Sequence, residues 1–298
     1  MTFANMIDML TVNPCIKTAM KASPHTFDSL LSDKLTADML PNFIYGSYIG
    51  LAVTVFGLVP TITAMFGKSI LPSLAESCAK NDKKAMQSGL TKMLIVTGII
   101  AIPAGMGIAV LSEPILRFLF GGRETEIQVC IMPMSILGIA VIFLAIATPC
   151  FAILQTLGKP HKAIIIMLAG GIIKLFLNII LIRQPIINIS GAAISTLVSE
   201  VFICVLSVRS VCKMTDLKPK VSEIFVKPTY AAIMCSVTAV LSHETLTKIA
   251  HLQINHRFVT LFSIGIGSTM YFFCLYLLCE TPKNIVNYIF SKKNPQNP

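Results

Sequence analysis

The stretch that decides the fold class is residues 131–157, IMPMSILGIAVIFLAIATPCFAILQTL, which contains no charged side chain. A helix rises about 1.5 Å per residue, so about 20 apolar residues are enough to cross the hydrocarbon core of a bilayer. Soluble proteins do not expose apolar runs of this length to water. The stretch therefore predicts a membrane-spanning helix.

Similar apolar runs lie on both sides of this stretch and are separated by short polar segments. Several of the runs contain Pro or Gly, which membrane helices tolerate where neighbouring helices satisfy the freed backbone groups. We therefore expect an all-α integral membrane protein with about seven transmembrane helices. The expected spans are residues 42–75, 93–120, 131–157, 163–182, 192–211, 226–241 and 258–279.

The overall composition agrees with a membrane location. Hydrophobic residues make up 54% of the chain and charged residues 13%, whereas soluble domains carry about 25% charged residues. The net charge of +10 comes from Lys and Arg in short loops between the apolar runs, not from one face of a helix. This distribution favours contact with anionic membrane lipids and argues against binding to nucleic acid.

The basic residues also give an orientation. The loops at 76–92, 158–162, 209–227 and 280–298 hold most of the Lys and Arg residues, and the alternate loops hold fewer. The positive-inside rule then places the C-terminus of a multi-pass protein in the cytoplasm. The tail from Pro282 to Lys293 either forms a short amphipathic helix on the inner leaflet or is a frayed end.

The first residues do not resemble a signal peptide, because they lack a basic start and a cleavage site. Residues 1–12 read instead as the end of a helix, and we expect further chain before it. This gives three regions: residues 1–40 are the remnant of a transmembrane helix plus an outward loop, residues 41–281 are a C-terminal transmembrane lobe, and residues 282–298 are a cytoplasmic tail.

No catalytic constellation is present in the sequence. There is no Walker A, HExxH, GxSxG or CxxC motif, and the five histidines are scattered among the loops. The nine cysteines are odd in number and lie mostly in or beside apolar runs, where they act as small packing residues. We therefore expect no enzyme activity, no cofactor and no metal site.

Two ionisable residues lie deep within predicted spans, where a charge is costly and usually faces the bundle interior or a water-filled path. Lys174 and Glu200 each lie roughly 18 Å from the cytoplasmic ends of adjacent antiparallel helices. An ion pair between them is geometrically possible, and Asn178 follows Lys174 by one turn. The pair either neutralises itself between two helices or lines a transport cavity that binds an anionic head group or relays ions.

Three further polar residues are candidates for the same cavity. Lys68 lies far enough from a cytoplasmic helix end that it must either snorkel to the interface or face the interior. Asn5 and Asp8 lie on the leading helix. The full set of transport-cavity candidates is Lys174, Asn178, Glu200, Lys68, Asn5 and Asp8.

Several segments resemble a known family in their order and spacing. They are GKSILPSLAE at 67–76, the lysine-rich loop KNDKK at 80–84, IPAG at 102–105, LSEPILRFLF at 111–120, LQTLGKP at 154–160 and NISGAA at 188–193. From about Ala4 to about Thr281 the chain resembles the stage V sporulation protein B branch of the polysaccharide transporters. That branch shares a superfamily with multidrug-and-toxin extrusion antiporters and lipid II flippases.

The resemblance implies a fold of fourteen helices in two pseudo-symmetric lobes around a central cavity, of which this chain would supply the C-terminal lobe. It also implies alternating-access movement of a lipid-linked oligosaccharide or lipid II-like precursor across the bacterial cytoplasmic membrane, for cortex or wall synthesis. The missing N-terminal lobe would be a required partner, so the chain alone would be incomplete as a transporter.

One departure leaves the substrate open. Lipid II flippases carry a basic residue early in the helix that corresponds to the first span, whereas residues 50–54 here are GLAVT. Another undecaprenyl-linked sugar is therefore an alternative substrate. A cation-coupled multidrug antiporter of the same fold is a second reading, although only Glu200 is a mid-span carboxylate. A truncated, non-transporting membrane protein is a third.

Overall fold

The structure is a computed structural model that describes residues 3–22, 36, 38–80, 82–216, 225–250 and 256–278. Everything regular in these residues is helical. In chain order the helices are α1 (Phe3–Ala22), α2 (Leu40–Ser47), the π-helix η2 (Tyr48–Val53), α3 (Thr54–Phe56), α4 (Leu58–Ala79), α5 (Lys83–Val110), α6 (Ser112–Phe120), α7 (Glu124–Thr156), α8 (Pro160–Leu181), α9 (Ser190–Thr215), α10 (Lys227–Ala250) and α11 (His256–Leu278).

Six helical segments in the described part of the chain are long and apolar enough to cross a membrane. They are Leu40–Ala79, Lys83–Val110, Glu124–Thr156, Pro160–Leu181, Ser190–Thr215 and Phe258–Leu277. The expected span at 226–241 is a helix, α10, but it is not among the six. The reason is its composition, since Ser, Thr, His and Glu residues interrupt the apolar ones along its second half.

The first span is a continuous helical segment with one irregular region. A π-helical stretch at Tyr48–Val53 leads through one short turn to Gly57, where α4 begins. A π-helix adds a residue to a turn and shifts the faces that follow. Pro60 fits near this start because the first N–H groups of a helix have no partner within it.

The second expected span, residues 93–120, is wrong in its extent. The helix breaks at Leu111 into α5 and the short helix α6. Pro114 explains the break, because it offers no N–H to the carbonyl one turn earlier and its ring crowds that carbonyl. Ser135 on α7 donates a hydrogen bond of 2.7 Å to the carbonyl of Ala109, so this end of α5 is satisfied by a neighbouring helix.

The proline inside α5, Pro103, is tolerated because a neighbouring helix satisfies the carbonyl that it leaves free. Pro103 cannot donate to the carbonyl of Ile99, which lies four residues earlier. The hydroxyl of Tyr271 on α11 donates to that carbonyl at 2.8 Å. This contact ties α11 to α5, and α10 and α11 also pack against each other.

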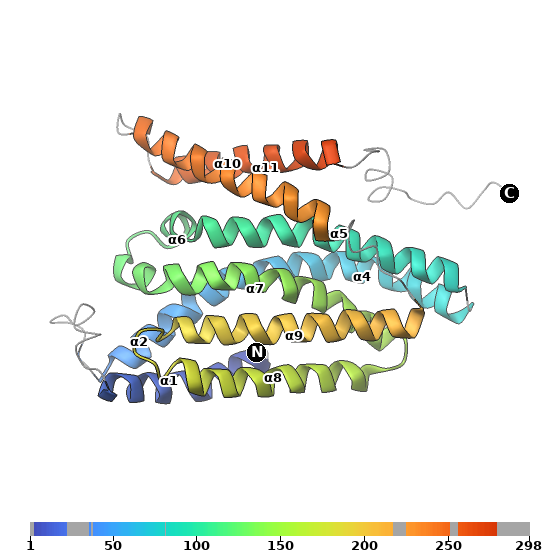
Figure 1. Cartoon of the computed structure of the whole chain (residues 1–298), viewed down its shortest axis with the longest axis horizontal. Helices are drawn as coiled ribbons and strands as arrows, with labels where there is room; N and C mark the ends of the chain where they lie inside the picture. Colours follow the sequence, from blue (N-terminus) through green and yellow to red (C-terminus); the bar gives the residue numbers. More distant parts are fainter. Residues whose placement is uncertain are drawn as a thin grey trace.

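The helices form one bundle in which α7 is central. It packs against α9, α5 and α4, while α1 lies against α8 at one edge and α10 with α11 lies at the other (Figure 1). The largest buried cluster joins α1, α2, η2, α7 and the start of α9. The bundle therefore encloses α7 and leaves α8 and α11 with open faces.

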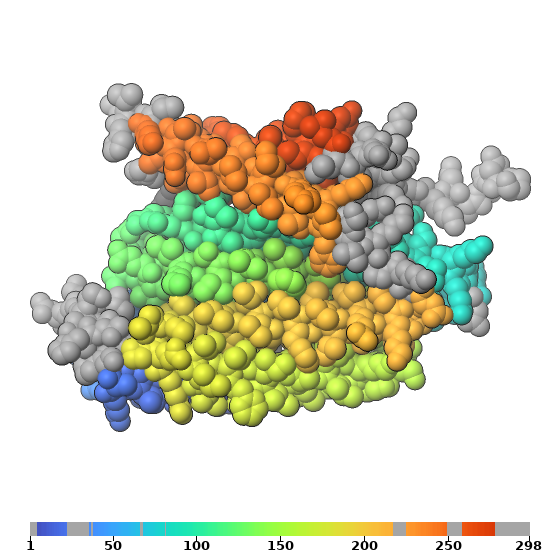
Figure 2. Space-filling view, viewed as in Figure 1, coloured from blue at the N-terminus to red at the C-terminus, as the bar shows by residue number. Residues whose placement is uncertain are grey.

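Large apolar side chains cover the outward face of α8, which forms part of the broad surface in Figure 2. They are Ile164, Ile165, Leu168, Ile172, Phe176 and Ile180. A contiguous apolar face of this kind suits lipid and does not suit water. The chain is thus a multi-pass membrane protein whose polar groups must be accommodated inside the bundle.

Candidate functional site

A cavity of about 530 Å³ lies inside the bundle between α1, the η2–α4 segment, α7, α8 and α9. Its lining is mostly apolar but includes the charged residues Asp8, Lys68, Lys174 and Glu200. Small-molecule sites have volumes of about 300–1,000 Å³ and combine apolar walls with a few polar groups. The cavity therefore has the size and the lining of a binding site.

The first polar feature of the site is a buried ion pair. Lys174 Nζ on α8 donates to Asp8 Oδ2 on α1 at 2.7 Å, and the two side chains are 3% and 2% exposed. Two charges taken out of water are stable only when their geometry is good and their other atoms are also hydrogen-bonded. The surrounding side chains meet that requirement for Asp8.

Three further side chains complete this network. Asn178 Nδ2, one turn after Lys174 on α8, donates to Asp8 Oδ1 at 2.9 Å and to Thr11 Oγ1 at 2.9 Å. Ser195 on α9 donates a short hydrogen bond to Asn178 Oδ1. We call Asp8, Thr11, Lys174, Asn178 and Ser195 the polar seam, because it joins α1, α8 and α9.

The polar seam corrects one expectation from the sequence. Lys174 lies in the bundle interior, but its ion pair is with Asp8, and within the described residues no ion pair joins it to Glu200. Sequence distance hid the true partner, since Asp8 lies 166 residues away. The adjacency of α8 and α9 made Glu200 the obvious choice, whereas packing of α1 on α8 brings a different carboxylate to the lysine.

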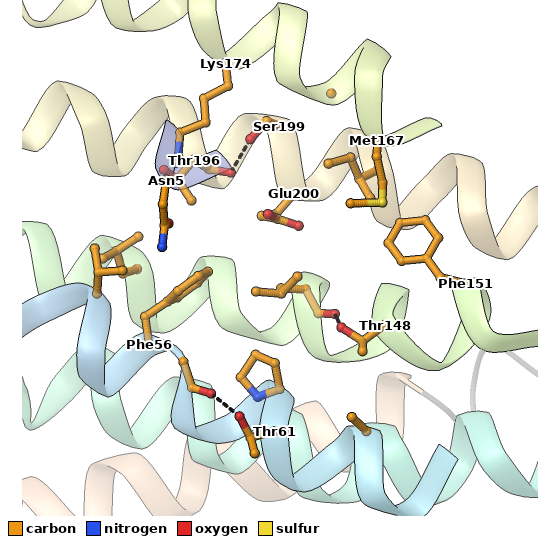
Figure 3. A pocket seen from close by; sticks show the side chains of 18 of the residues that line it. Asn5, Phe56, Thr61, Thr148, Phe151, Met167, Lys174, Thr196, Ser199 and Glu200 are labelled. Atoms are coloured by element: carbon orange, nitrogen blue, oxygen red, sulfur yellow. Dashed lines mark hydrogen bonds between the residues drawn. The ribbon is translucent and has the colours of Figure 1, made fainter. Parts of the chain in front are cut away.

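Glu200 occupies a different part of the cavity. It is 6% exposed, and its Oε2 atom has no hydrogen-bond partner among the residues that the structure describes. Figure 3 shows its carboxyl group in the open space, with Phe56 on one side and Phe151 on the other. A buried carboxyl oxygen without a partner is unfavourable, so this position needs an explanation beyond packing.

Of the three remaining candidate residues, two line the cavity and one lies behind its wall. Asn5, half-buried on α1, and Lys68, exposed on α4, both line the cavity. Asn178 does not line it; it holds Asp8 in place from behind. Five of the six sequence candidates thus border one cavity, and the sixth supports one of them.

Sequence reasoning missed several residues of the site. The aromatic rings of Phe56 and Phe151 and the hydroxyl of Thr148 line the cavity, and Thr11 and Ser195 belong to the polar seam. Every apolar run of this chain contains Phe or Thr, so these residue types carry no signal. Of these residues, only Thr11 could have been found from the sequence, because it follows Asp8 by three residues and so lies on the same face of the helix.

Comparison with known proteins agrees with this architecture. Residues 45–262 match the model of the family described as Lipid II flippase MurJ. The chain is 26% identical over 136 residues to the Lipid II flippase MurJ of Bacillus subtilis (strain 168), covering 46% of this chain and 25% of that protein. It is 22% identical over 182 residues to Stage V sporulation protein B of the same organism, covering 60% of this chain and 34% of that protein.

A solved structure shares the fold. An inward-facing multidrug resistance MATE family transporter of the MOP superfamily superimposes with a TM-score of 0.54 and 15% identity, covering 93% of this chain and 59% of that one. The chain therefore matches only part of the length of its relatives. The resemblance to the polysaccharide transporter superfamily is confirmed, and this superfamily consists of transporters and not of enzymes.

Proposed function

The chain belongs to the Lipid II flippase MurJ family, and on that premise we propose that it forms part of a transporter that moves a lipid-linked sugar precursor across a membrane. The observation that carries the proposal is the partly open cavity of about 530 Å³, which is bordered by five helical segments and whose lining includes three buried charged residues. Ionisable side chains inside a membrane bundle are costly, and they mark transport paths more often than packing contacts.

Residues 41–281 would form the C-terminal lobe of a two-lobe, fourteen-helix transporter, with residues 1–40 supplying a helix and an outward loop and residues 282–298 a cytoplasmic tail. The fold match, which covers 93% of this chain but 59% of the other transporter, supports this division. Alternating access would then open the cavity to one leaflet and afterwards to the other. The basic loops support a cytoplasmic C-terminus in a bacterial cell membrane, in contact with anionic lipids.

The proposal covers two kinds of substrate, lipid II and other undecaprenyl-linked sugars. The names of two relatives, Lipid II flippase MurJ and Stage V sporulation protein B, refer to lipid II and to sporulation, which supports a wall or cortex precursor. A cation-coupled drug antiporter of the same fold is the second candidate. Oε2 of Glu200, which has no hydrogen-bond partner among the described residues, favours that candidate, because it could bind a cation directly.

Complementation tests the proposal. We would express the chain alone, and fused to a first lobe from the same genome, in a strain depleted of its wall-sugar flippase. Growth rescue by the fusion supports a flippase lobe. The absence of rescue, with both proteins stable in the membrane, contradicts a wall-precursor substrate and favours the antiporter, which drug-efflux measurements on the same strains would detect.

A further inference from the structure

One residue of the cavity wall, Glu200, carries a buried hydrogen-bond acceptor that is not used. Glu200 Oε2 is buried and accepts no hydrogen bond from any described residue. Among the described residues that line the cavity, Glu200 is the one whose side chain has a buried oxygen or nitrogen atom without a hydrogen-bond partner. A ligand that brings hydrogen-bond donors to this point would satisfy it.

The two cations of the cavity are not equivalent. The ammonium of Lys174 is already bound to Asp8 in the polar seam, and its side chain is only 3% exposed. Lys68 is exposed and lies seven residues, or about two turns, after Thr61 on the cavity face of α4. An anionic group of a ligand would therefore meet Lys68, away from the carboxyl group of Glu200.

Aromatic rings lie on two sides of Glu200. Phe56 comes from the η2–α4 segment and Phe151 from the end of α7, and Figure 3 shows the carboxyl group between them. The half-buried Thr148 adds a hydroxyl group to the same wall. Flat apolar rings beside a carboxyl group suit a ligand with an apolar face and a hydroxylated edge, which is the character of a sugar ring.

We propose that the cavity is a carbohydrate subsite, in which a glycosyl group lies between Phe56 and Phe151 and donates its hydroxyl or amide hydrogens to Glu200, while its phosphate points toward Lys68. This inference rests on the proposed function and deepens it, because it assigns the sugar, and not the phosphate, to the buried part of the site. Lys174 takes no part in phosphate binding.

A matched pair of ligands tests the assignment. Farnesyl pyrophosphate and farnesyl-pyrophosphoryl-N-acetylglucosamine share a lipid and a pyrophosphate and differ only in the sugar. We would measure binding of both to the purified 298-residue chain in nanodiscs. The wild-type chain should bind the glycosylated ligand about 10-fold more tightly or better, since hydrogen bonds to a charged group contribute at least this much.

Substitutions then locate the preference. Glu200→Gln and Phe151→Leu keep side-chain size and should each reduce the preference for the glycosylated ligand toward unity. Lys68→Gln should weaken both ligands by a similar factor and leave their ratio unchanged. Glu244→Gln is the matched control, because Glu244 is an exposed glutamate on α10 outside the cavity lining.

The outcomes separate the inference from the function on which it rests. Equal binding of the two ligands by the wild-type chain, which needs no substitution, overturns the carbohydrate subsite. Displacement of the glycosylated ligand by tetraethylammonium also overturns it and assigns Glu200 to cations. If complementation succeeds while either result is found, the flippase proposal stands and only the subsite is wrong.

Discussion

The helices of the bundle are held together in two different ways, one where α5 packs on α7 and the other where α1, α8 and α9 meet. On one side α5 crosses α7 through glycines, and a Cβ atom on Gly138 would lie 2.5 Å from the backbone N of Ala109 and 2.8 Å from the carbonyl O of Gly105. On the other side α1, α8 and α9 meet through the polar seam, centred on Asp8 and Lys174. The first contact leaves no space, whereas the second borders a cavity of about 530 Å³.

The difference shows how one membrane bundle can be rigid and still enclose a site. In lipid, small residues allow backbones to approach and gain van der Waals contact. Hydrogen bonds between buried side chains hold helices together at the greater distance that polar side chains require. We therefore expect the glycine crossing to be sensitive to added volume and the polar seam to be sensitive to unbalanced charge.

Removing one charge from the polar seam should have the largest effect. Asp8→Asn or Lys174→Met alone leaves the other ion buried without its counter-charge, and each should lower the free energy of unfolding by about 3–5 kcal/mol. The double substitution should recover much of this loss, because neither charge remains. Thermal and chemical unfolding of the purified variants would measure it.

An additive loss in the double variant would break the comparison, because it would mean that the two residues act separately. The ion pair would then have no special role in holding α1 on α8. Asn178→Leu provides a further check, since it should weaken the seam without removing a charge.

Adding one methyl group to the glycine crossing should have the next largest effect. Gly138→Ala places a Cβ against backbone atoms that cannot rotate away, and overpacking of this kind costs about 1–3 kcal/mol. Gly107→Ala on α5 is the matched control, because a Cβ there meets nothing within 4 Å. If both substitutions lower the melting temperature equally, helix propensity and not close packing is responsible.

A glycine on the cavity side sharpens the contrast. A Cβ on Gly170 of α8 would lie 2.3 Å from Cγ1 of Ile203, which is the side chain of α9 and not its backbone. Gly170→Ala should therefore cost about 1 kcal/mol or less after the isoleucine adjusts. Combining it with Ile203→Ala, which removes both contacting carbon atoms, Cγ1 and Cδ1, should show favourable coupling in a double-mutant cycle, whereas strict additivity would show that the two positions do not interact.

The smallest effect is expected for a similar charge cluster in water. Arg117 on α6 contacts Glu113 at 2.9 Å and Glu124 at 2.5 Å, but all three side chains are about half exposed. Exposed pairs contribute about 0–1 kcal/mol and are screened by salt. Arg117→Gln should lower the melting temperature only slightly at low salt and not at all at high salt. A loss of stability as large as that of Asp8→Asn would contradict the idea that burial makes the difference.

The positions of the spans could be predicted because hydropathy is a local property. The run at 131–157 became the core of α7, and the runs at 163–182 and 192–211 lie within or beside α8 and α9. Helix boundaries were harder, since Pro114 stops α5 at a place where the apolar run continues. The tail at 282–298, for which the sequence left an amphipathic helix and a frayed end open, lies outside the described residues, so that expectation stays untested.

The ionisable residues of the site could be picked out from the sequence, but their pairing could not. Buried charges in apolar runs are rare, so Lys174, Glu200 and Asp8 were visible as candidates. From the sequence, an ion pair between Lys174 and Glu200 was geometrically possible, because neighbouring helices are joined by a short connection, but it was not settled. It carried no signal for α1 packing on α8, which brings together residues that are 166 positions apart.

The sequence by itself determined that the chain enters a membrane, where its apolar helices run and which polar residues must be hidden from lipid. These follow from the cost of each residue in hydrocarbon, which does not depend on distant neighbours. Only the tertiary structure decided that Asp8 pairs with Lys174 and that Glu200 lines the cavity with its Oε2 atom lacking a hydrogen-bond partner among the described residues. Pairing depends on which helices touch and on their rotation, and those are settled by packing across the whole bundle.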